Sequence, residues 1–597
     1  MKIRETEGPS WWFHTAGAGT MQSSGLQSLL EATHLSGPEV FVREATQNSV
    51  DAASHAARRP VRLTFSSFAL TPSQNDALHN FLVPDDEIRE RVRSVVDQGR
   101  IAPDGGFFLR GHDGTEPTNV LLVEDFETKG LGGDLGTMGP DDHFSRLVYF
   151  FGQSHGEGNQ GGAYGFGKSA YSVASDVRTV VYYSKPENGS PSRLIAVALL
   201  PEHRHGGKGA TGFALCGLPT DDPDFPIAPV EGEAADELAA SIGMSRRDET
   251  SPGTSVFVVD ARYDVNDLRR ALERWWWPRL VTTGPSGLTA EFKDHGHPLP
   301  PPAPSSREDL APFVRAFQHL LDARDDTPET KTRPIRSIGK RVVGKAALRR
   351  IDADPDPPDD DDPVPFGRHV ALLRGPRLVV SYLPAGRDTG TPFAGVFVAD
   401  DAMDAVLRRA ENPAHDNWSP ESTKLEGHEP TYVRSIAKGV TRFASEFQDA
   451  FESKPLPSTS KLRALEDLLG RVFASGSSPG PVPQGPERPV SLSIREQRDP
   501  EQHLDRAYID VEPRFGDEAI PCRMRVSADL MGDAHLAKLD PLEVTLFDEH
   551  GTPLADGLRP EHAFVVEPGD RMRFRAEASP PADAIVKFSV TLSGRDA

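Results

Sequence analysis

The stretch VREATQNSVDAASHA, residues 42–56, constrains this chain more than any other part of its sequence. Just before it, Ser36 and Glu39 stand at the spacing of a capping box, and Pro38 suits the first turn of a helix. Small apolar residues such as Ala45 recur through the stretch. The sequence therefore predicts a partly buried helix that begins next to Ser36.

Three polar residues of this predicted helix fall on one face. Glu44, Asn48 and Asp51 are separated by four and three positions, so they line up along one side. A carboxylate removed from water without a partner is costly, so this row needs something to bind. An amide oxygen suits Mg²⁺, and a carboxylate one turn away can take a proton from an attacking water. The alternative is a solvated helix face.

Length and composition limit the class of protein. A chain of 597 residues is long enough for about three or four domains of about 150 residues. No run reaches the ~20 apolar residues that span a bilayer, no signal peptide is evident, and Cys216 and Cys522 are too few for a disulfide framework. We expect a cytoplasmic protein without a membrane partner. The net charge of -23 argues against indiscriminate coating of nucleic acid but leaves room for a local basic patch.

Shifts in composition divide the chain into blocks. The first block mixes helices with apolar strands such as NVLLVEDF and SVFVVDA, and the second contains a hairpin-like HVALLRGPRLVVSYL followed by helical stretches near 431–453 and 459–474. A Pro-, Gly- and Ser-rich linker follows, and then short alternating runs typical of a β-sandwich. The predicted boundaries are 1–285, 286–474, 475–489 and 490–597.

A second segment with chemical character is NVLLVEDFETKGLGG, residues 119–133. An apolar strand ends at Asp125 and continues into a Gly-rich loop. An aspartate at a strand end can accept a hydrogen bond from the exocyclic amine of adenine. By itself the pattern is weak, because aspartate before a glycine turn is common.

The third segment is QGGAYGFGKSAYSVAS, in which Gly162, Gly165 and Gly167 allow close approach of a backbone. Lys168 and Ser169 then open a predicted helix whose N-terminal amides favour an anion. Gly162 to Ser169 also matches the P-loop spacing G-x-x-x-x-G-K-[ST] literally. A P-loop should follow a buried strand, whereas the preceding YFFGQSHGEGNQGG is polar, and that interpretation leaves the Glu44 helix unexplained. We therefore interpret the P-loop match as a coincidence and keep a P-loop-type NTPase only as a weaker alternative.

The order of these boxes, completed by SPGTSVFV, resembles that of the GHKL ATPases. This superfamily includes the ATPase component of DNA gyrase, the ninety-kilodalton heat-shock chaperones, histidine kinases, MutL and MORC. The resemblance covers roughly residues 20–285 and implies an α+β chain. Its parts would be a GHKL (Bergerat) ATP-binding α/β sandwich, an α/β transducer-like domain and a C-terminal β-sandwich.

The resemblance also implies a role for each matching residue. Glu44 would be the general base, Asn48 would ligate Mg²⁺, and Asp51 would help to organise the pocket. Asp125 would bind the adenine amine of ATP, with Thr254 supporting that contact. The remaining nucleotide-binding residues would be Gly130, Gly162, Gly165, Gly167, Lys168 and Ser169, with Lys168 also counted as catalytic.

One departure from the family lies in its second box, which usually reads D-x-G-x-G. Here Asp125 is followed by Phe126-Glu127-Thr128-Lys129-Gly130, so the first glycine is missing. The loop geometry at this point is therefore open.

Within the superfamily, the chain looks closest to bacterial MORC/MutL-like ATPases, a group often encoded with phage-defence genes. This likeness implies a homodimer that closes on ATP, slow turnover, companion defence proteins, and DNA bound directly or through a partner. A heat-shock-90-like remodelling ATPase and a non-hydrolysing nucleotide-sensing scaffold are the alternatives. The basic residue expected to reach the γ-phosphate is sought among Lys340, Lys345, Arg374 and Arg377.

Other segments have simpler interpretations. At least one tryptophan of 275–277 is expected to seal a domain boundary. The basic run 331–350 either contacts phosphates or is a solvated loop beside an acidic linker. NPAHDNW, residues 412–418, predicts a structured turn rather than a metal site.

Overall fold

The structure is a computed structural model whose chain falls into two compact units, Met1–Pro457 and Ser458–Ala597. The described residues of the first unit are 8–17, 35–54, 58–97, 106–109, 117–137, 142–149, 166–351, 367–375, 377–387, 390–412 and 415–451. Those of the second unit are 490–499, 504–513, 520–531, 537–538, 543–547, 553–558, 561–566, 572–578 and 585–594.

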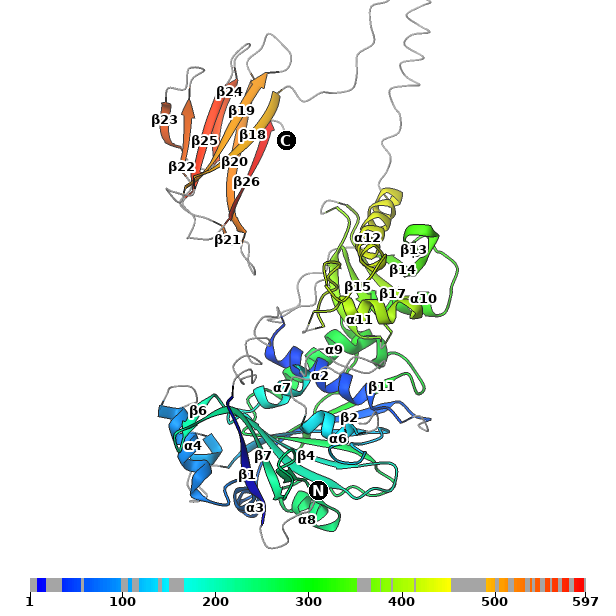
Figure 1. The fold of residues 1–597 in the computed structure, drawn as a ribbon. Helices are drawn as coiled ribbons and strands as arrows, with labels where there is room; N and C mark the ends of the chain where they lie inside the picture. Colours follow the sequence, from blue (N-terminus) through cyan, green and yellow to red (C-terminus); the bar gives the residue numbers. More distant parts are fainter. Residues whose placement is uncertain are drawn as a thin grey trace, which may run out of the picture. The chain divides into compact units, whose positions relative to one another are not determined.

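The first unit begins with a large mixed sheet (Figure 1). Its path is β1-β7-β5-β4-β10-β3-β2-β11-β12, with β6 and β8 attached to β7 and β9 attached to β5. The strands are β1 (Ser10–Thr15), β2 (Val61–Ala69), β3 (Asn119–Phe126), β4 (Thr179–Lys185), β5 (Arg193–Leu199), β6 (His203–His205), β7 (Lys208–Pro219), β8 (Ile227–Ala228), β9 (Val230–Glu231), β10 (Gly253–Val259), β11 (Leu288–Asp294) and β12 (His297–Pro298).

Helices cover both faces of this sheet. They are α2 (Gly37–Asp51), α3 (Pro72–Leu82), α4 (Asp86–Asp97), α5 (Gly106–Leu109), α6 (His143–Val148), α7 (Phe166–Val173), α8 (Glu233–Ser241) and α9 (Val265–Leu280). Along β10, Val256 and Val258 pack into the core that contains α2, α7 and α9, whereas Phe257 and Val259 pack into the core that contains α3, α4 and α8. Because successive side chains point to opposite faces, strands buried on both sides are apolar throughout.

The predicted helix at the N-terminal side is confirmed. Ser36 is the N-cap of α2, and both its backbone amide and its hydroxyl donate to Oε2 of Glu39, at 2.8 and 2.9 Å. Pro38 lies in the first turn. This cap fixes where α2 begins and therefore which of its residues face the core.

A five-stranded sheet follows in the order β13-β14-β17-β15-β16. Its strands are β13 (Thr330–Arg336), β14 (Val342–Arg350), β15 (His369–Leu373), β16 (Val379–Pro384) and β17 (Phe393–Ala399). The remaining helical elements are η2 (Pro304–Ser306), α10 (Ala311–Leu321), η3 (Ile338–Lys340), η4 (Asp401–Met403), α11 (Asp404–Ala410) and α12 (Glu429–Phe451). The predicted hairpin of β15 and β16 and the predicted helix near 431–453 are thus present.

One face of this second sheet shares a core with the first sheet. Ala347 and Val396 belong to the same cluster as α9 and α10, whereas Ala346 and Leu348 pack with α11 and α12. The first sheet also continues beyond residue 285, because β11 pairs with β2 in parallel and Leu288 aligns with Val61. The two sheets are therefore parts of one compact unit.

The second unit contains two antiparallel sheets. Their orders are β18-β19-β25-β22-β23 and β21-β20-β24, with β26 paired to β20. The strands are β18 (Val490–Asp499), β19 (Leu504–Pro513), β20 (Ile520–Met531), β21 (Ala537–Lys538), β22 (Glu543–Phe547), β23 (Pro553–Leu558), β24 (Glu561–Val566), β25 (Met572–Ala578) and β26 (Ile585–Gly594). The helix predicted at 459–474 and the linker at 475–489 lie outside the described residues. No helix among the described residues is long and apolar enough to cross a membrane.

Candidate functional site

The polar row of α2 faces the protein. Glu44 is buried with 7% of its surface exposed, Asn48 is half-buried, and Asp51 at the end of the helix remains exposed. Helix α2 packs against α9 and α7, and Asn48 of the row interacts with Tyr171 of α7. The alternative hypothesis, that the whole polar row lies on a solvated helix face, is therefore wrong, because Glu44 is buried.

Glu44 is a buried carboxylate that no side chain of the described residues hydrogen-bonds. Burial raises its pKa, and the positive charges of His415 and Arg43 oppose that rise. A buried acid without a hydrogen-bond donor is expensive, and such groups in native proteins usually have a water, ion or ligand as partner.

Asn48 also has an unused polar atom. Its amide nitrogen Nδ2 is buried without a hydrogen-bond partner among the described residues, and its side chain lies close enough to Tyr171 of α7 to oppose the rise that burial causes in the pKa of that phenol. Although Asp51 keeps contact with solvent, partial desolvation by the surrounding protein raises its pKa, against the charges of Arg374 and Arg408. The amide oxygen of Asn48 and the carboxylates of Glu44 and Asp51 are ligand types that suit a hydrated Mg²⁺, whereas the unpartnered Nδ2 of Asn48 is a donor that suits a phosphate oxygen.

Asp125 lies at the end of β3 in a buried pocket of donors. Its Oδ1 accepts hydrogen bonds from the backbone amide of Thr254 at 2.8 Å and from the Thr128 hydroxyl at 2.5 Å, and its Oδ2 accepts from Ser49 at 3.2 Å. Burial raises the pKa of Asp125, while Arg247 and these hydrogen bonds lower it. The predicted pair Asp125 and Thr254 is therefore in direct contact, and Ser49 links it to α2.

Arg247 is a residue of this pocket that the sequence did not reveal. Its guanidinium is buried and donates to the carbonyls of Asp125 and Thr254, each at 2.9 Å. It also lies over the ring of Phe126, 4.7 Å from the centroid. Arg247 thus clamps β3 to β10, and no local motif around it signals this role.

The loop after Asp125 keeps an unusual backbone without the missing glycine. Glu127, two residues after the aspartate, has a φ of 63°, in the left-handed region that favours glycine. Gly130 has a φ of 65°, and a Cβ on it would lie 2.4 Å from the carbonyl oxygen of Lys185. Glu127 therefore occupies the position of the missing glycine in a strained conformation, and Gly130 is required three residues later because a side chain there would clash.

The predicted phosphate loop is described only at its end. Gly162 and Gly165 lie outside the described residues, as does all of 150–165. Gly167 and Lys168 lie in the first turn of α7, and Ser169 next to them is buried. Helix α7 packs against α2, so the described end of the predicted phosphate loop lies beside the helix that carries Glu44 and Asn48.

The four basic candidates occupy different environments. Lys340 and Lys345 are exposed on the β13–β14 hairpin. Arg374 is buried and its charge acts on Asp51, whereas Arg377 donates a 3.0 Å hydrogen bond to the hydroxyl of Thr282. Of these four, Arg374 is the one whose charge acts on the α2 row.

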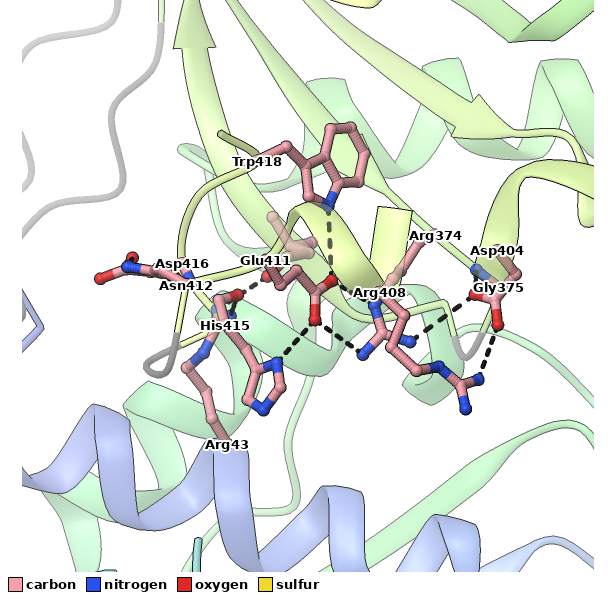
Figure 2. Close-up of polar contacts among 11 residues, drawn as sticks. Arg43, Arg374, Gly375, Asp404, Arg408, Glu411, Asn412, His415, Asp416 and Trp418 are labelled. Carbon is pink, nitrogen blue, oxygen red and sulfur yellow. Dashed lines mark hydrogen bonds and ion pairs between the residues drawn. The ribbon is translucent and has the colours of Figure 1, made fainter. Parts of the chain in front are cut away.

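A buried polar network joins the second sheet to α2 (Figure 2). Glu411, at the end of α11, accepts hydrogen bonds from both Arg374 and His415, and the His415 contact measures 2.6 Å. Arg43 of α2 donates to the carbonyl oxygens of His415 and Val379, the latter at 2.8 Å. The turn expected at 412–418 is thus part of a domain contact, and no group of three metal-ligating side chains lies within the described part of the chain.

The three tryptophans of α9 contribute to the same contact. All three are buried, and Trp277 donates a 3.1 Å hydrogen bond to the Tyr382 hydroxyl of β16. The ring of Trp275 lies 5.6 Å from that of Tyr382, centroid to centroid, at an interplanar angle of 54°, and its Nε1 donates a 2.7 Å hydrogen bond to Glu39. These tryptophans therefore pack between the first sheet's helix α9 and β16 of the second sheet, within one compact unit.

No protein-family model matches the chain, and no curated protein matches it by sequence. Similar solved structures include the ATPase region of Saccharomyces cerevisiae topoisomerase II, with 7% identity, a TM-score of 0.30, and coverage of 68% of this chain and 83% of that one. For the same region bound to ICRF-187 (dexrazoxane), the identity is 7%, the TM-score is 0.30, and the match covers 69% of this chain and 86% of that one. For the ATPase and transducer domains of DNA topoisomerase II from Balamuthia mandrillaris, the identity is 7%, the TM-score is 0.28, and the match covers 68% of this chain and 84% of that one. Likeness at this level carries no weight by itself, so the function is argued from the residues of the chain.

Proposed function

We propose that this chain binds ATP with Mg²⁺ and hydrolyses it slowly, as a GHKL-type ATPase. The observation that carries the proposal is the buried carboxylate of Glu44, which no side chain of the described residues hydrogen-bonds. It lies one helical turn from Asn48, whose buried Nδ2 lacks a hydrogen-bond partner among the described residues. Both groups would be satisfied by a hydrated metal–nucleotide complex. Ser49 of the same helix donates a hydrogen bond to Asp125, which connects the donor pocket around Asp125 to this helix.

Each residue has a definite task in this proposal. Glu44 takes the proton of a water whose oxygen attacks the γ-phosphorus, while the bond to the bridging oxygen breaks and ADP leaves. Asn48 holds Mg²⁺, which when bound neutralises phosphate charge. Asp125 accepts a hydrogen bond from the exocyclic amine of adenine, and the backbone amide of Thr254 orients its carboxylate. The phosphates would be enclosed by Gly130, Gly162, Gly165, Gly167, Lys168 and Ser169, with Asp51 organising the pocket.

The first test is Mg²⁺-dependent ATP hydrolysis and ATP binding by wild type, Glu44→Ala and Asn48→Ala. Glu44→Ala should bind ATP but hydrolyse it about 100-fold more slowly or worse, because it lacks the general base. Asn48→Ala should lose the Mg²⁺ dependence of binding. Glu90→Ala, at an exposed position on α4, is the matched control. Wild-type turnover by Glu44→Ala would reject the proposal and favour the P-loop alternative, with Lys168 the next residue to change.

The biological role proposed for this activity is that of an ATP-gated homodimeric clamp in DNA-linked antiviral defence, of the MORC/MutL-like kind, acting with companion proteins. A basic surface supports contact with DNA. On the β13–β14 hairpin and α12, exposed cations without an ion pair among the described residues include Arg336, Lys340, Arg341, Lys345 and Lys438. The chain as a whole is acidic, so this local concentration of charge selects a polyanion at this place.

The hairpin and α12 form one continuous surface. The Ser337 and Ser435 hydroxyls hydrogen-bond at 2.8 Å, and Arg341 lies over the ring of Tyr432 at 5.0 Å. Stimulation of ATP hydrolysis by duplex DNA would favour the clamp. Stimulation by an unfolded protein, with no response to DNA, would favour the heat-shock-90-like alternative.

A further inference from the structure

We propose that His415, held by Glu411 and Arg374, is a positioning residue for Glu44 and makes hydrolysis depend on docking of the second sheet against α2. The inference rests on the proposed ATPase function and adds to it a named group from outside the nucleotide-binding boxes. We call Arg374, Glu411 and His415 the relay.

The relay is rigid on the side away from α2. Arg374 binds both carboxylate oxygens of Glu411, and its third nitrogen lies 3.6 Å from Asp404, which is also bound by Arg408 at 2.7 Å. Nδ1 of His415 binds Oε2 of Glu411 at 2.6 Å. With Nδ1 fixed by a carboxylate, the orientation of the imidazole is set and its other nitrogen, Nε2, is left for a second partner. Figure 2 shows the ring lying between Glu411 and α2.

The relay is also tied to α2 through backbone atoms. Arg43, the neighbour of Glu44 in sequence, donates to the carbonyl oxygen of His415 and crosses 372 positions of sequence to do so. A second hydrogen bond of Arg43, 2.8 Å long, reaches the carbonyl oxygen of Val379 in β16. His415 itself has a φ of 55°, a left-handed conformation that costs free energy in a non-glycine residue and persists only where its surroundings hold it.

Charge explains what this placement does. Burial disfavours the ionised form of Glu44, and of the groups around it the positive charge of His415 opposes this effect most strongly. Burial alone would lower the pKa of His415, but its hydrogen bond to Glu411 and the charge of Glu411 raise this pKa overall, which favours the protonated imidazole. Besides each other, the charged groups that act most strongly on Glu44 or His415 are Arg43 and Asp51 of α2 and Arg374 and Glu411 of the second-sheet region.

A merely structural function is a weaker account of the relay. Buried ion pairs stabilise folds little, because the cost of desolvating both charges offsets their attraction. The relay instead holds His415 against α2 through the hydrogen bond from Arg43, where its positive charge opposes the effect of burial on Glu44, the carboxylate that the ATPase mechanism needs ionised. If the second sheet moves away from α2, Glu44 loses this cation together with the anchor of Arg43.

The test compares wild type with His415→Gln, Glu411→Gln and the double variant. His415→Gln removes the charge, and Glu411→Gln removes the group that retains the proton on His415. Single-turnover ATP hydrolysis gives the rate of the chemical step, titration with a non-hydrolysable ATP analogue gives binding, and thermal unfolding gives stability. His369→Gln is the matched control, because among the described residues the side chain of His369 hydrogen-bonds the carbonyl of Gly367 in the same sheet region and no charged partner.

Each single variant should slow hydrolysis at least tenfold while the affinity for the analogue changes less than threefold. The double variant should be no slower than the worse single variant, because both act through one group. A hydrolysis rate within twofold of wild type in His415→Gln overturns the inference, and so does loss of folding in both single variants, which would make the relay structural. If wild type itself does not hydrolyse ATP, or Glu44→Ala hydrolyses normally, the proposed function has failed rather than this extension of it.

Discussion

The backbone amide of Thr254 donates a 2.8 Å hydrogen bond to Oδ1 of Asp125, although 129 positions separate the two residues. The contact joins the end of β3 to the start of β10, which are antiparallel neighbours. It uses one lone pair of the carboxylate and fixes its plane, so that the remaining capacity of Oδ2 points in one direction. A carboxylate oriented in this way is suited to select one ring edge of a purine.

Replacing Asp125 by Asn should weaken ATP binding about 10- to 100-fold, because the amide that replaces one oxygen donates where the adenine amine also donates. Binding of GTP should change less, so the ratio of the two affinities is the informative quantity. Both can be measured by nucleotide titration. Asp134→Asn, at an exposed position after the same loop, controls for a general loss of charge. An unchanged ATP:GTP ratio would remove Asp125 from base recognition.

Glu127→Gly should raise the stability of the protein by about 0.5–1 kcal/mol. The left-handed conformation costs a non-glycine residue about 1–2 kcal/mol, and the greater freedom of glycine in the unfolded chain returns part of that gain. The midpoint of urea unfolding measures the effect. Lys129→Gly is the control in the same loop, since Lys129 has no positive φ and the change should destabilise. Destabilisation by Glu127→Gly would mean that the side chain contributes more than its backbone strain costs.

The carboxylate of Glu411 should make stability depend on acid pH. Burial raises its pKa, but Arg374 and His415 outweigh burial and lower the pKa from 4.5 to about 2. A group with a lowered folded pKa stabilises the fold above its unfolded pKa, and this contribution is lost as pH falls from about 4.5 towards about 2. Thermal unfolding between pH 2 and 7 should therefore show a steeper acid loss in wild type than in Glu411→Gln. Parallel curves would contradict the ion pairing assigned to Glu411.

Some of this site follows from sequence because it obeys local rules. The capping box of Ser36 and Glu39 fixes α2, and the period of a helix then puts Glu44 and Asn48 on one face. The strand that ends at Asp125 is apolar along its length because both its faces are buried. These features depend on residues within a few positions of one another, so a single sequence is enough to predict them.

Other parts of the site depend on contacts that no local pattern encodes. Arg247 reaches the carbonyl of Asp125 across 122 positions, and its neighbours in sequence are ordinary loop residues. His415 stands in a segment that predicts only a turn, and its part in the site arises when the second sheet packs against α2. Membership of β11 in the first sheet is likewise decided by parallel pairing with β2, whose partner residues are more than 200 positions away. Tertiary packing, not propensity, determines all three.

The basic surface of the β13–β14 hairpin gives a last prediction, on DNA. Arg336→Glu combined with Lys340→Glu should weaken binding of duplex DNA and lower the slope of log affinity against log salt by about one for each phosphate that is no longer bound. Fluorescence anisotropy of a labelled duplex at several salt concentrations measures both quantities. Lys208→Glu, an exposed reversal on the first sheet, is the control and should change neither. If the hairpin variant and the Lys208→Glu control lower the affinity for DNA equally, with no change in the salt slope, the effect is one of net charge. DNA binding would then have to come from a partner protein.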